Sequence, residues 1–349
     1  MRWSAALVLV ATLLAGCSDD GDDEREPDAV PQASARPTPD ASGSAAAAPS
    51  AEDPEPTVTL PPVRHPVSLP ALMREEFRAS RIRQVRVVAE TDAYTRSEVT
   101  YRSGDLTISG VLLRPRGRGP FPGIVLNHGY IEPSTYVTGQ GLAREQDWLA
   151  RAGFVVLHTD YRGHAGSDPA GPIDRETRLG YTRDAINAVL ALEREPYVDQ
   201  GRMAMLGRSM GGGITLNALV AHPGLVEAAV IYASVSSRFL DNLEHFTARS
   251  RPEAVRALYD RFGTPRREPR FYRELSSRTF FDRISEPLLI HHGTADETCP
   301  FRWATTTQRL LRRGGVDSRL EVHEGEHHAF VPQWQASMVR TVQFLRRRL

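Results

Sequence analysis

From residue 123 onward, the hydrophobic and polar residues of the chain follow two alternating patterns. Short, mostly apolar runs, typical of strands buried on both faces, occupy residues 123–129, 154–160, 202–207, 226–234, 286–293 and 318–324. Longer stretches with the three-to-four-residue period of helices occupy residues 141–153, 174–195, 209–223, 301–315 and 332–349. This alternation predicts an α/β fold, with a mostly parallel central sheet and helices on both faces.

Other segments depart from this alternation. Residues 98–103 and 106–115 alternate polar and apolar side chains, which predicts an antiparallel strand pair ahead of the parallel sheet. Residues 69–80, before that pair, have the pattern of an amphipathic helix. Residues 236–285 contain no clear strand and are rich in aromatic residues and arginine. We interpret residues 236–285 as a small helical lid inserted between two strands; a peripheral helical insertion without a gating role is an equal alternative.

The first residues have the pattern of an export signal. Arg2 precedes an apolar run, residues 7–14, that is too short to span a bilayer as a helix and has the length of a signal-peptide core. The run ends in the letters LAGC, which resemble the lipobox of bacterial lipoproteins. This resemblance implies that residues 1–16 are a signal peptide and that Cys17 is lipidated. A plain secretory peptide is the alternative.

The segment after this signal is poor in large apolar residues. Residues 17–66 consist mainly of Asp, Glu, Pro, Ala, Ser and Gly, and such a composition predicts a disordered tether. Residues 67–349 are then expected to form the folded domain. We therefore expect an exported lipoprotein that a lipid anchor on Cys17 holds at a bacterial membrane, on the periplasmic or cell-surface side.

Charge and cysteine content exclude several kinds of chemistry. Arg and Lys together number 43, Asp and Glu also number 43, and the formal net charge is +0, so nothing favours a nucleic-acid partner. All 43 basic residues are arginine, which excludes mechanisms that depend on lysine, such as a phosphate-binding loop or a Schiff base. Cys17 and Cys299 are the only cysteines, so lipidation of Cys17 leaves no internal disulfide.

The segment "MLGRSMGGG", residues 205–213, places Ser209 among glycines between a predicted strand and a predicted helix. A phosphate-binding loop is excluded because it needs lysine, and the spacing does not fit the dinucleotide motif G-x-G-x-x-G. The segment fits G-x-S-x-G, in which the serine is a nucleophile on a strained turn. Gly207 and Gly211 are expected where side chains would collide with the neighbouring strand and helix. A packing turn with an incidental hydroxyl is the alternative.

A nucleophilic serine needs a base, and the base needs an acid that orients it. Asp296 follows the predicted strand 286–293, and His327 and His328 follow the predicted strand 318–324. Serine, acid and histidine therefore come in the order expected of this motif, each just after a different strand.

These motifs carry a family resemblance. The segments "NHGY", "DYRGHAGSD", "GRSMGG", "HGTADETCP" and "GEHHAF" resemble the α/β-hydrolases. The similarity is to the catalytic domain of prolyl-oligopeptidase-type serine peptidases and to dienelactone-hydrolase-like esterases. It implies a triad of Ser209, Asp296 and His328, with His327 at a position where glycine is usual. It also implies an oxyanion hole made by the N–H of Met210 and by either the N–H or the hydroxyl of Tyr130.

Other candidate side chains have a simpler structural explanation. His128 is expected to fix its loop by a hydrogen bond, and the segment "DYRGHAGSD" to organise the loop beside the site. His291 and His292 are expected to be buried and hydrogen-bonded, because no carboxylate or cysteine set accompanies them at the spacing of a metal site. We therefore expect neither a metal nor another cofactor.

The triad predicts acyl transfer to Ser209 and then to water, but leaves the acyl donor open. Prolyl oligopeptidases carry a β-propeller, and the chain ahead of the catalytic domain is too short for one. We expect an esterase acting on small or medium-sized substrates. The alternative is a serine peptidase acting on short peptides or amides; a non-catalytic surface binding module is an alternative of another class.

Overall fold

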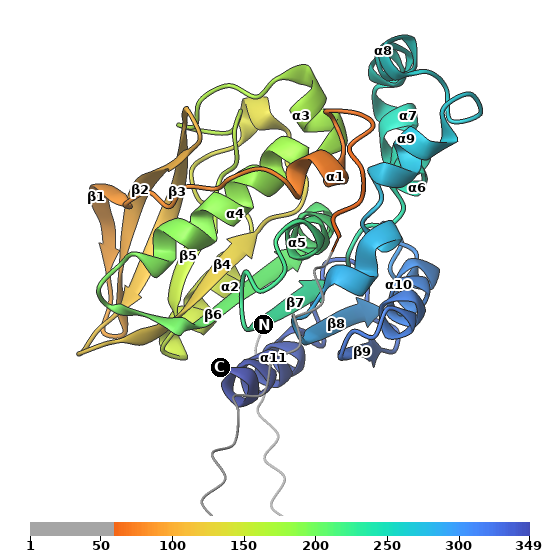
Figure 1. Ribbon diagram of the computed structural model, residues 1–349. Helices are drawn as coiled ribbons and strands as arrows, with labels where there is room; N and C mark the ends of the chain where they lie inside the picture. Colours follow the sequence, from red (N-terminus) through yellow and green to blue (C-terminus); the bar gives the residue numbers. More distant parts are fainter. Residues whose placement is uncertain (1–58) are drawn as a thin grey trace, which may run out of the picture. The chain divides into compact units, whose positions relative to one another are not determined.

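The computed structural model describes residues 59–349. These residues contain a nine-stranded sheet (Figure 1). The predicted signal peptide, Cys17 and most of the predicted tether lie outside the described residues. Across the sheet the order is β1-β2-β3-β5-β4-β6-β7-β8-β9. The strands are β1 (Arg83–Glu90), β2 (Tyr94–Ser103), β3 (Leu106–Pro115), β4 (Phe121–Asn127), β5 (Val155–Thr159), β6 (Val198–Arg208), β7 (Ala228–Tyr232), β8 (Leu288–Gly293) and β9 (Ser318–His323).

Strand direction divides the sheet into two parts. β1, β2 and β3 pair antiparallel with their neighbours, and β3 also pairs antiparallel with β5. From β5 through β4, β6, β7 and β8 to β9, every pairing is parallel. The carboxyl ends of the parallel strands therefore share one edge, where α/β sheets place their sites. The predicted α/β fold with a mostly parallel sheet is confirmed.

Helices cover both faces of this sheet. Along β4, Val125 packs into one hydrophobic core, which includes α4 and α5, while Ile124 and Leu126 pack into a second core, which includes α2 and α11. Because neighbouring strand residues face opposite sides, both sides must be apolar, and this explains the continuous apolar runs. Outside the 236–285 insertion, the helices are α1 (Leu69–Leu72), α2 (Ala143–Arg151), α3 (Pro172–Thr177), α4 (Leu179–Glu193), α5 (Met210–Ala221), α10 (Phe301–Arg313) and α11 (Trp334–Arg348), with a short η1 (Pro133–Thr135).

Two expectations at the start of the fold are wrong. The predicted helix 69–80 is reduced to α1, four residues long, because the polar residues after Met73 offer little apolar surface to bury. Residues 83–90, for which no element was expected, form the edge strand β1. All eight of its residues are exposed and its pairing with β2 has two irregularities, so the usual alternation of polar and apolar positions is missing.

The long helix predicted over residues 174–195 is two helices. α3 ends and α4 begins at Arg178, whose backbone is left-handed with a φ of 62°. The N–H of Arg178 still donates to the Asp174 carbonyl (2.8 Å), which closes α3. The start of α4 packs directly on the Asp174 side chain, since a Cβ at Gly180 would overlap it. A periodic sequence pattern continues through such a break and cannot reveal it.

The insertion between β7 and β8 is helical, as expected. It consists of α6 (Phe239–Asn242), the π-helical turn η2 (Leu243–Thr247), α7 (Ala248–Ser250), α8 (Pro252–Phe262), α9 (Pro269–Glu274) and η3 (Ser277–Arg283). The chain just before α1 packs on it: Arg64 pairs with Glu274 (3.2 Å), and the His65 ring meets the ring edges of Phe262 and Phe271. The described residues that precede α1 thus contact the insertion. Within the described residues, no helix combines the length and apolarity needed to cross a membrane.

Candidate active site

Ser209 lies in the sharp turn between β6 and α5. Its φ of 54° is unusual for a residue with a side chain, and such backbone strain costs about 1–3 kcal/mol. The turn is held by the surrounding sheet: the Ser209 N–H donates to the Tyr232 carbonyl (2.9 Å), and the Ser209 carbonyl accepts from Val235 (3.2 Å). The conformation is therefore imposed by β7 and the residues after it.

The flanking glycines make this turn possible. A Cβ at Gly207 would overlap the carbonyl of Gly211, and a Cβ at Gly211 would overlap the carbonyl of Asn127 at the end of β4. The strand, the turn and the start of α5 thus approach more closely than side chains allow, as expected. This close approach also brings the β4 loop to the serine: a Cβ at Gly129 would lie 3.2 Å from Ser209 Cβ.

Asp296 and His328 come together from two different loops. Asp296 follows β8, His328 follows β9, and His328 Nδ1 lies 2.9 Å from Asp296 Oδ2 and 3.1 Å from Oδ1. Two backbone hydrogen bonds fix the Asp296 carboxylate: its Oδ1 accepts from the N–H groups of Thr298 (2.9 Å) and Cys299 (2.7 Å). This arrangement leaves Nε2 of His328 free to act as a base.

His327 and His328 have different surroundings. The side chain of His327 is 64% exposed and its Nδ1 lies 3.1 Å from Glu297, away from Asp296. Between Ser209 and His328, no direct hydrogen bond is formed in the described part of the chain. Contacts of this kind are often long before substrate binds, so the separation does not conflict with a base role.

A buried carboxylate shapes the loop that carries His328. Glu326, 1% exposed, accepts backbone hydrogen bonds from His327 (3.2 Å), Val331 (3.0 Å) and Gln333 (2.6 Å). Its own carbonyl accepts from Ala295 (3.1 Å), beside Asp296. Glu326 therefore fixes the histidine loop and ties it to the acid loop; sequence reasoning noted the residue only as part of a motif.

Two arginines hold the same loop from its other side. Arg208, next to Ser209, donates to the carbonyl of His328 (2.5 Å) and pairs with the buried Glu145 (3.3 Å). Arg144 on α2 donates to the two carbonyls that follow, those of Ala329 (3.1 Å) and Phe330 (3.2 Å). The nucleophile turn and the histidine loop are thus joined directly. No sequence motif indicated this connection.

The two expected oxyanion donors flank Ser209. Met210 begins α5, and Tyr130 follows Gly129 at the end of the β4 loop. Among residues 59–349, neither backbone N–H donates to another group, so both are available to an incoming oxygen. The Tyr130 hydroxyl is engaged elsewhere: it donates to Glu132 (2.7 Å) and accepts from Arg175 (2.6 Å). The structure thus favours the N–H of Tyr130 over its hydroxyl.

Cys299 is buried beside the nucleophile. The Ser209 hydroxyl is close enough to hydrogen-bond with the thiol, but burial is the larger influence and raises the thiol pKa well above its ordinary value. The thiol therefore stays protonated and unreactive at neutral pH. Together with Val235 and Trp303 it forms a small apolar cluster.

The remaining candidates have structural roles. Asp160 accepts from Ser109 (2.6 Å), Tyr136 (2.8 Å) and the N–H of Gly139 (2.8 Å), and Arg162 forms a bidentate pair with Asp184. The rings of four buried histidines are neutral because burial lowers the pKa of each: His128, whose pKa falls to about 4, His164, His291 and His292. In the described part of the chain, no group of three or more His, Cys, Asp or Glu side chains could hold a metal ion.

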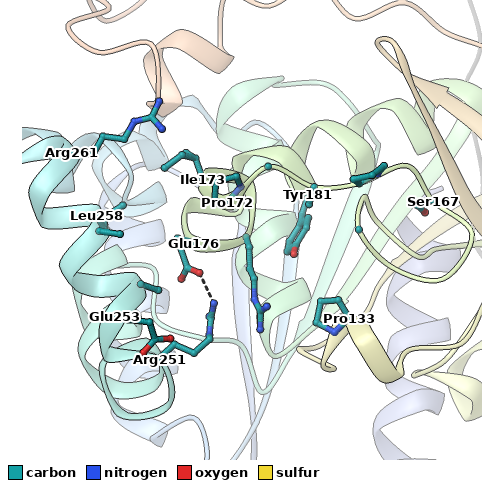
Figure 2. Close-up of a pocket in the computed structure, with 17 residues that line it drawn as sticks. Pro133, Ser167, Pro172, Ile173, Glu176, Tyr181, Arg251, Glu253, Leu258 and Arg261 are labelled. Atoms are coloured by element: carbon teal, nitrogen blue, oxygen red, sulfur yellow. Dashed lines mark hydrogen bonds and ion pairs between the residues drawn. The ribbon is translucent and has the colours of Figure 1, made fainter.

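A cavity of about 830 Å³ lies between the start of α4 and the insertion (Figure 2). Ile173 and Leu258 give it apolar walls, and an ion pair between Glu176 and Arg251 joins α3 to the start of α8. Arg175 lines the same cavity and contacts Tyr130, so the cavity adjoins the oxyanion loop. Sequence reasoning did not find this cavity.

The fold, the strained serine turn and the Asp296–His328 pair define a serine hydrolase of the α/β-hydrolase class. Residues 141–348 match the model of the prolyl oligopeptidase family. Because this match covers more than half of the chain, the protein belongs to the prolyl oligopeptidase family.

Relatives of this family include peptidases and, by fold, esterases. The chain is 25% identical to a Bacillus subtilis protein named uncharacterized peptidase YtmA, covering 69% of this chain and 89% of that one. An acetyl xylan esterase from Paenibacillus has the same fold with a TM-score of 0.61 and 22% identity, over 79% of this chain and 91% of the esterase. An acylaminoacyl peptidase from Pyrococcus horikoshii has a TM-score of 0.60 and 22% identity, over 74% of this chain and 42% of the peptidase. The protein therefore spans less than half of that peptidase.

Proposed function

We propose that Ser209, His328 and Asp296 catalyse hydrolysis of a carboxylic ester through an acyl-enzyme, with the N–H groups of Met210 and Tyr130 as oxyanion donors. The observation that carries this proposal is the joint geometry. A serine on a strained turn lies next to two free N–H donors, and a histidine is oriented by a buried carboxylate.

The proposed chemistry follows from these positions. His328 Nε2 accepts the proton as Ser209 Oγ attacks the substrate carbonyl, and Asp296 stabilises the resulting imidazolium through Nδ1. The negative charge that develops on the carbonyl oxygen is bound by the two N–H groups. His328 then returns the proton to the leaving alcohol. A water molecule, activated in the same way, releases the acid and restores Ser209.

An ester is proposed ahead of a peptide because little in the described chain selects by size. The residues ahead of the sheet, 59–82, contain only the short helix α1, so no propeller blade precedes the fold within the described residues. The insertion and the cavity beside it leave room for substrates of moderate size. A peptidase acting on short peptides is the second candidate, because the chain belongs to the prolyl oligopeptidase family and is similar to a protein named a peptidase.

One set of assays separates these candidates. The full-length protein is tested on p-nitrophenyl esters and aminoacyl p-nitroanilides, with Ser209→Ala as the control. Ester turnover that disappears in the variant supports the esterase, and anilide turnover that disappears supports the peptidase. Absence of both activities, together with no labelling by a fluorophosphonate, would overturn both and leave a binding module.

We further propose that the protein is a lipoprotein anchored to a bacterial membrane through Cys17. The support is the sequence alone, an apolar run that ends in the letters LAGC. Replacement Cys17→Ser should move the protein from the membrane fraction to the soluble exported fraction, whereas Cys299→Ser should not. Membrane retention of Cys17→Ser would contradict the proposal.

A further inference from the structure

The cavity between α3 and α8 is much larger than a small acyl group such as acetyl requires. Its volume of about 830 Å³ lies within the range of sites that enclose a ligand of drug size, about 300–1,000 Å³. Apolar side chains from three segments line it, among them Pro133, Pro172, Ile173, Ala254 and Leu258. Such walls favour a ligand with apolar surface, because binding removes that surface from water.

One face of α8 forms the wall on the side of the insertion. Ala254, Ala257, Leu258 and Arg261 are spaced by three or four residues, so they lie on the same side of the helix, and all four line the cavity. Leu258 is buried, whereas Arg261 is exposed. The two alanines leave space that larger side chains would occupy. The width of the cavity beside α8 therefore depends on these small residues.

The charged side chains that line the cavity leave no excess of either sign. Arg251 pairs with Glu176 (Figure 2), and Arg175 pairs with a carboxylate of the Tyr130 loop. The two other charged residues of the lining, Arg261 and Glu253, are exposed and have opposite signs. A charged ligand would lose hydration here without meeting a dedicated counter-ion. An uncharged ligand is therefore favoured.

Tyr181 offers this cavity a hydroxyl without a partner. The residue is 2% exposed, its side chain is directed into the cavity (Figure 2), and its hydroxyl forms no hydrogen bond among residues 59–349. Its ring is fixed by stacking on Tyr161, with ring centroids 5.2 Å apart, and by the edge of His164 at 5.6 Å. An unpaired buried hydroxyl gains a hydrogen bond when a ligand supplies an acceptor. A carbonyl oxygen is an acceptor of this kind that carries no charge.

Tyr130 connects the cavity with the reaction centre. Its N–H, which donates to no other group in the described chain, lies in the loop beside Ser209, and its hydroxyl accepts from Arg175 (2.6 Å), which lines the cavity. One tyrosine side chain and one hydrogen bond thus span the distance from the proposed oxyanion donor to the cavity wall. The same loop continues into that wall at Pro133. A substrate bound at Ser209 can therefore extend into the cavity.

We propose that the cavity binds an uncharged, largely apolar part of the substrate that carries a hydrogen-bond acceptor for the Tyr181 hydroxyl. The enzyme then prefers esters with a long alkyl or aryl group to acetyl esters, and neutral esters to acidic ones. The inference rests on the proposed hydrolase function and adds the substrate class.

The first test compares p-nitrophenyl esters that differ in one feature of the acyl group. The hexanoate is longer than the acetate, the 5-oxohexanoate adds a carbonyl oxygen, and the glutarate monoester has a carboxylate in place of the methyl ketone. Each further buried methylene should raise kcat/KM about 4-fold, so the hexanoate should exceed the acetate by about 10- to 100-fold. The acidic glutarate ester should be at least about 10-fold poorer than the 5-oxohexanoate. On the alcohol side, 2-naphthyl acetate is compared with phenyl acetate. Absence of a preference for the larger group in both series would overturn the proposal, and so would a preference for the acidic ester.

Variants of α8 test whether the cavity causes the preference. Ala254→Trp fills the cavity and should lower kcat/KM for the preferred larger ester about 10-fold, while the acetate stays within about 3-fold. Ala257→Trp, one turn further along, is a second filling variant. Arg256→Trp is the control, because Arg256 is exposed on α8 and does not line the cavity, and it should retain the preference. Equal effects of both filling variants on short and long esters would overturn the proposal.

Tyr181→Phe tests the hydrogen bond to the acceptor. It removes a hydroxyl that has no partner in the described chain, so the melting temperature should not fall. Relative to the hexanoate and octanoate, kcat/KM for the 5-oxohexanoate or the 7-oxooctanoate should drop about 3- to 10-fold. Unchanged ratios at both chain lengths would overturn the role of Tyr181.

A binding measurement separates this inference from the proposed function. Benzylacetone, an uncharged aryl ketone, should raise the melting temperature of Ser209→Ala more than hydrocinnamate, its acidic counterpart. It should not raise that of Ser209→Ala combined with Ala254→Trp. Ketone binding without any hydrolytic activity in the wild type would keep the cavity site and reject the hydrolase. Hydrolysis of esters without ketone binding, and without a preference for larger groups, would do the reverse.

Discussion

On one side of Ser209 the Asp296 and Glu326 carboxylates each accept several hydrogen bonds, whereas on the side of the Tyr130 loop, at the cavity, the Tyr181 hydroxyl and the Arg261 guanidinium form none with the described residues. Both regions contain charge, but Asp296 and Glu326 are buried, whereas most residues that line the cavity are not. On the first side the carboxylate partners are backbone N–H groups, His328 and the buried His292, whose Nε2 lies 3.3 Å from Asp296 Oδ2, so the geometry is set before substrate arrives. On the second side charge and hydroxyl groups remain unsatisfied at a cavity. Preset geometry suits groups that react, whereas unpaired polar groups at a cavity suit contact with a ligand.

This contrast has a physical basis. Catalysis gains when groups are already oriented in the free enzyme, because no reorganisation is then needed in the transition state. Recognition gains when the ligand supplies the missing partner, because a ligand that lacks it leaves a buried polar group unpaired. Changes on the first side should therefore lower activity toward all substrates, and changes on the second side should alter substrate preference.

The largest expected effect is on the reactive side, at Asp296. In Asp296→Asn the side-chain oxygen can still accept from Thr298 and Cys299, so the loop should fold. The amide NH₂ would then face His328 Nδ1 and favour the tautomer that cannot accept the proton of Ser209. We expect kcat/KM for p-nitrophenyl acetate to fall about 10³- to 10⁴-fold.

Glu297→Gln is the matched control for this change. Glu297 is the next residue, is exposed, and contacts His327 and the His328 N–H (3.4 Å), both of which glutamine can still contact, so its replacement should leave kcat/KM within about 3-fold. Circular dichroism spectra of both variants should match that of the wild type. An Asp296→Asn variant that retained a tenth of the activity would remove Asp296 from the proposed triad.

Acid stability isolates the contribution of His128, a buried histidine in the loop that carries Tyr130. His128 is buried against the rings of Tyr136 and Tyr161, and burial lowers its pKa to about 4 from an ordinary value of 6.5. The unfolded chain therefore binds more protons between these values. Through this group alone, the free energy of unfolding should fall by up to about 3 kcal/mol as the pH drops from about 6.5 to about 4.

Denaturant unfolding across this pH range measures the contribution. His128→Phe preserves the stacked ring and removes the proton, so its unfolding free energy should decline less steeply below pH 6.5 than that of the wild type. His327→Gln, at an exposed histidine of the other loop, should decline in parallel with the wild type. Parallel curves for His128→Phe and the wild type would show that His128 does not carry this effect.

A smaller loss is expected when the buried support of the reactive side is weakened. Gln at position 326 would offer one oxygen and one NH₂ to three backbone N–H donors, so at least one donor would lose its acceptor. Glu326→Gln should lower kcat/KM about 10-fold for neutral and acidic esters alike. Glu324→Gln, at a neighbouring exposed position, should change neither; selective loss of one substrate class in Glu326→Gln would contradict the division between the two sides.

Sequence patterns were sufficient to predict which residues form the reactive side, but not to predict the helix break and the cavity on the other side. Ser209, Asp296 and His328 each follow a buried strand, and the carboxyl ends of parallel strands meet at one edge, so their convergence could be expected. The break between α3 and α4 at Arg178 could not be predicted, because both helices share one periodic pattern. Arg208 and Arg144 hold the His328 loop through backbone carbonyls, which have no sequence signature. The edge strand β1 was missed because all of its residues are exposed.

Tyr130 joins the two sides, and the smallest effect is expected there. Its N–H is free beside Ser209, while its hydroxyl, on a side chain that is half exposed, is held by Glu132 and Arg175 at the cavity. If the N–H is the oxyanion donor, Tyr130→Phe removes only the contact to Glu132 and Arg175. We expect kcat for neutral esters to change less than about 3-fold, since a lost oxyanion donor costs about 10²- to 10³-fold.

The comparison variant is Tyr130→Pro, which lacks the backbone N–H and should lower kcat by the larger factor if the loop keeps its position. Because proline can also disturb the loop, thermal unfolding of both variants must accompany the kinetics. A loss of 100-fold in Tyr130→Phe, with an unchanged melting temperature, would show that the hydroxyl swings from Glu132 to the oxyanion during the reaction. The Tyr130 side chain would then belong to the reactive side, and Arg175, which donates to its hydroxyl, would be the first residue of the cavity side.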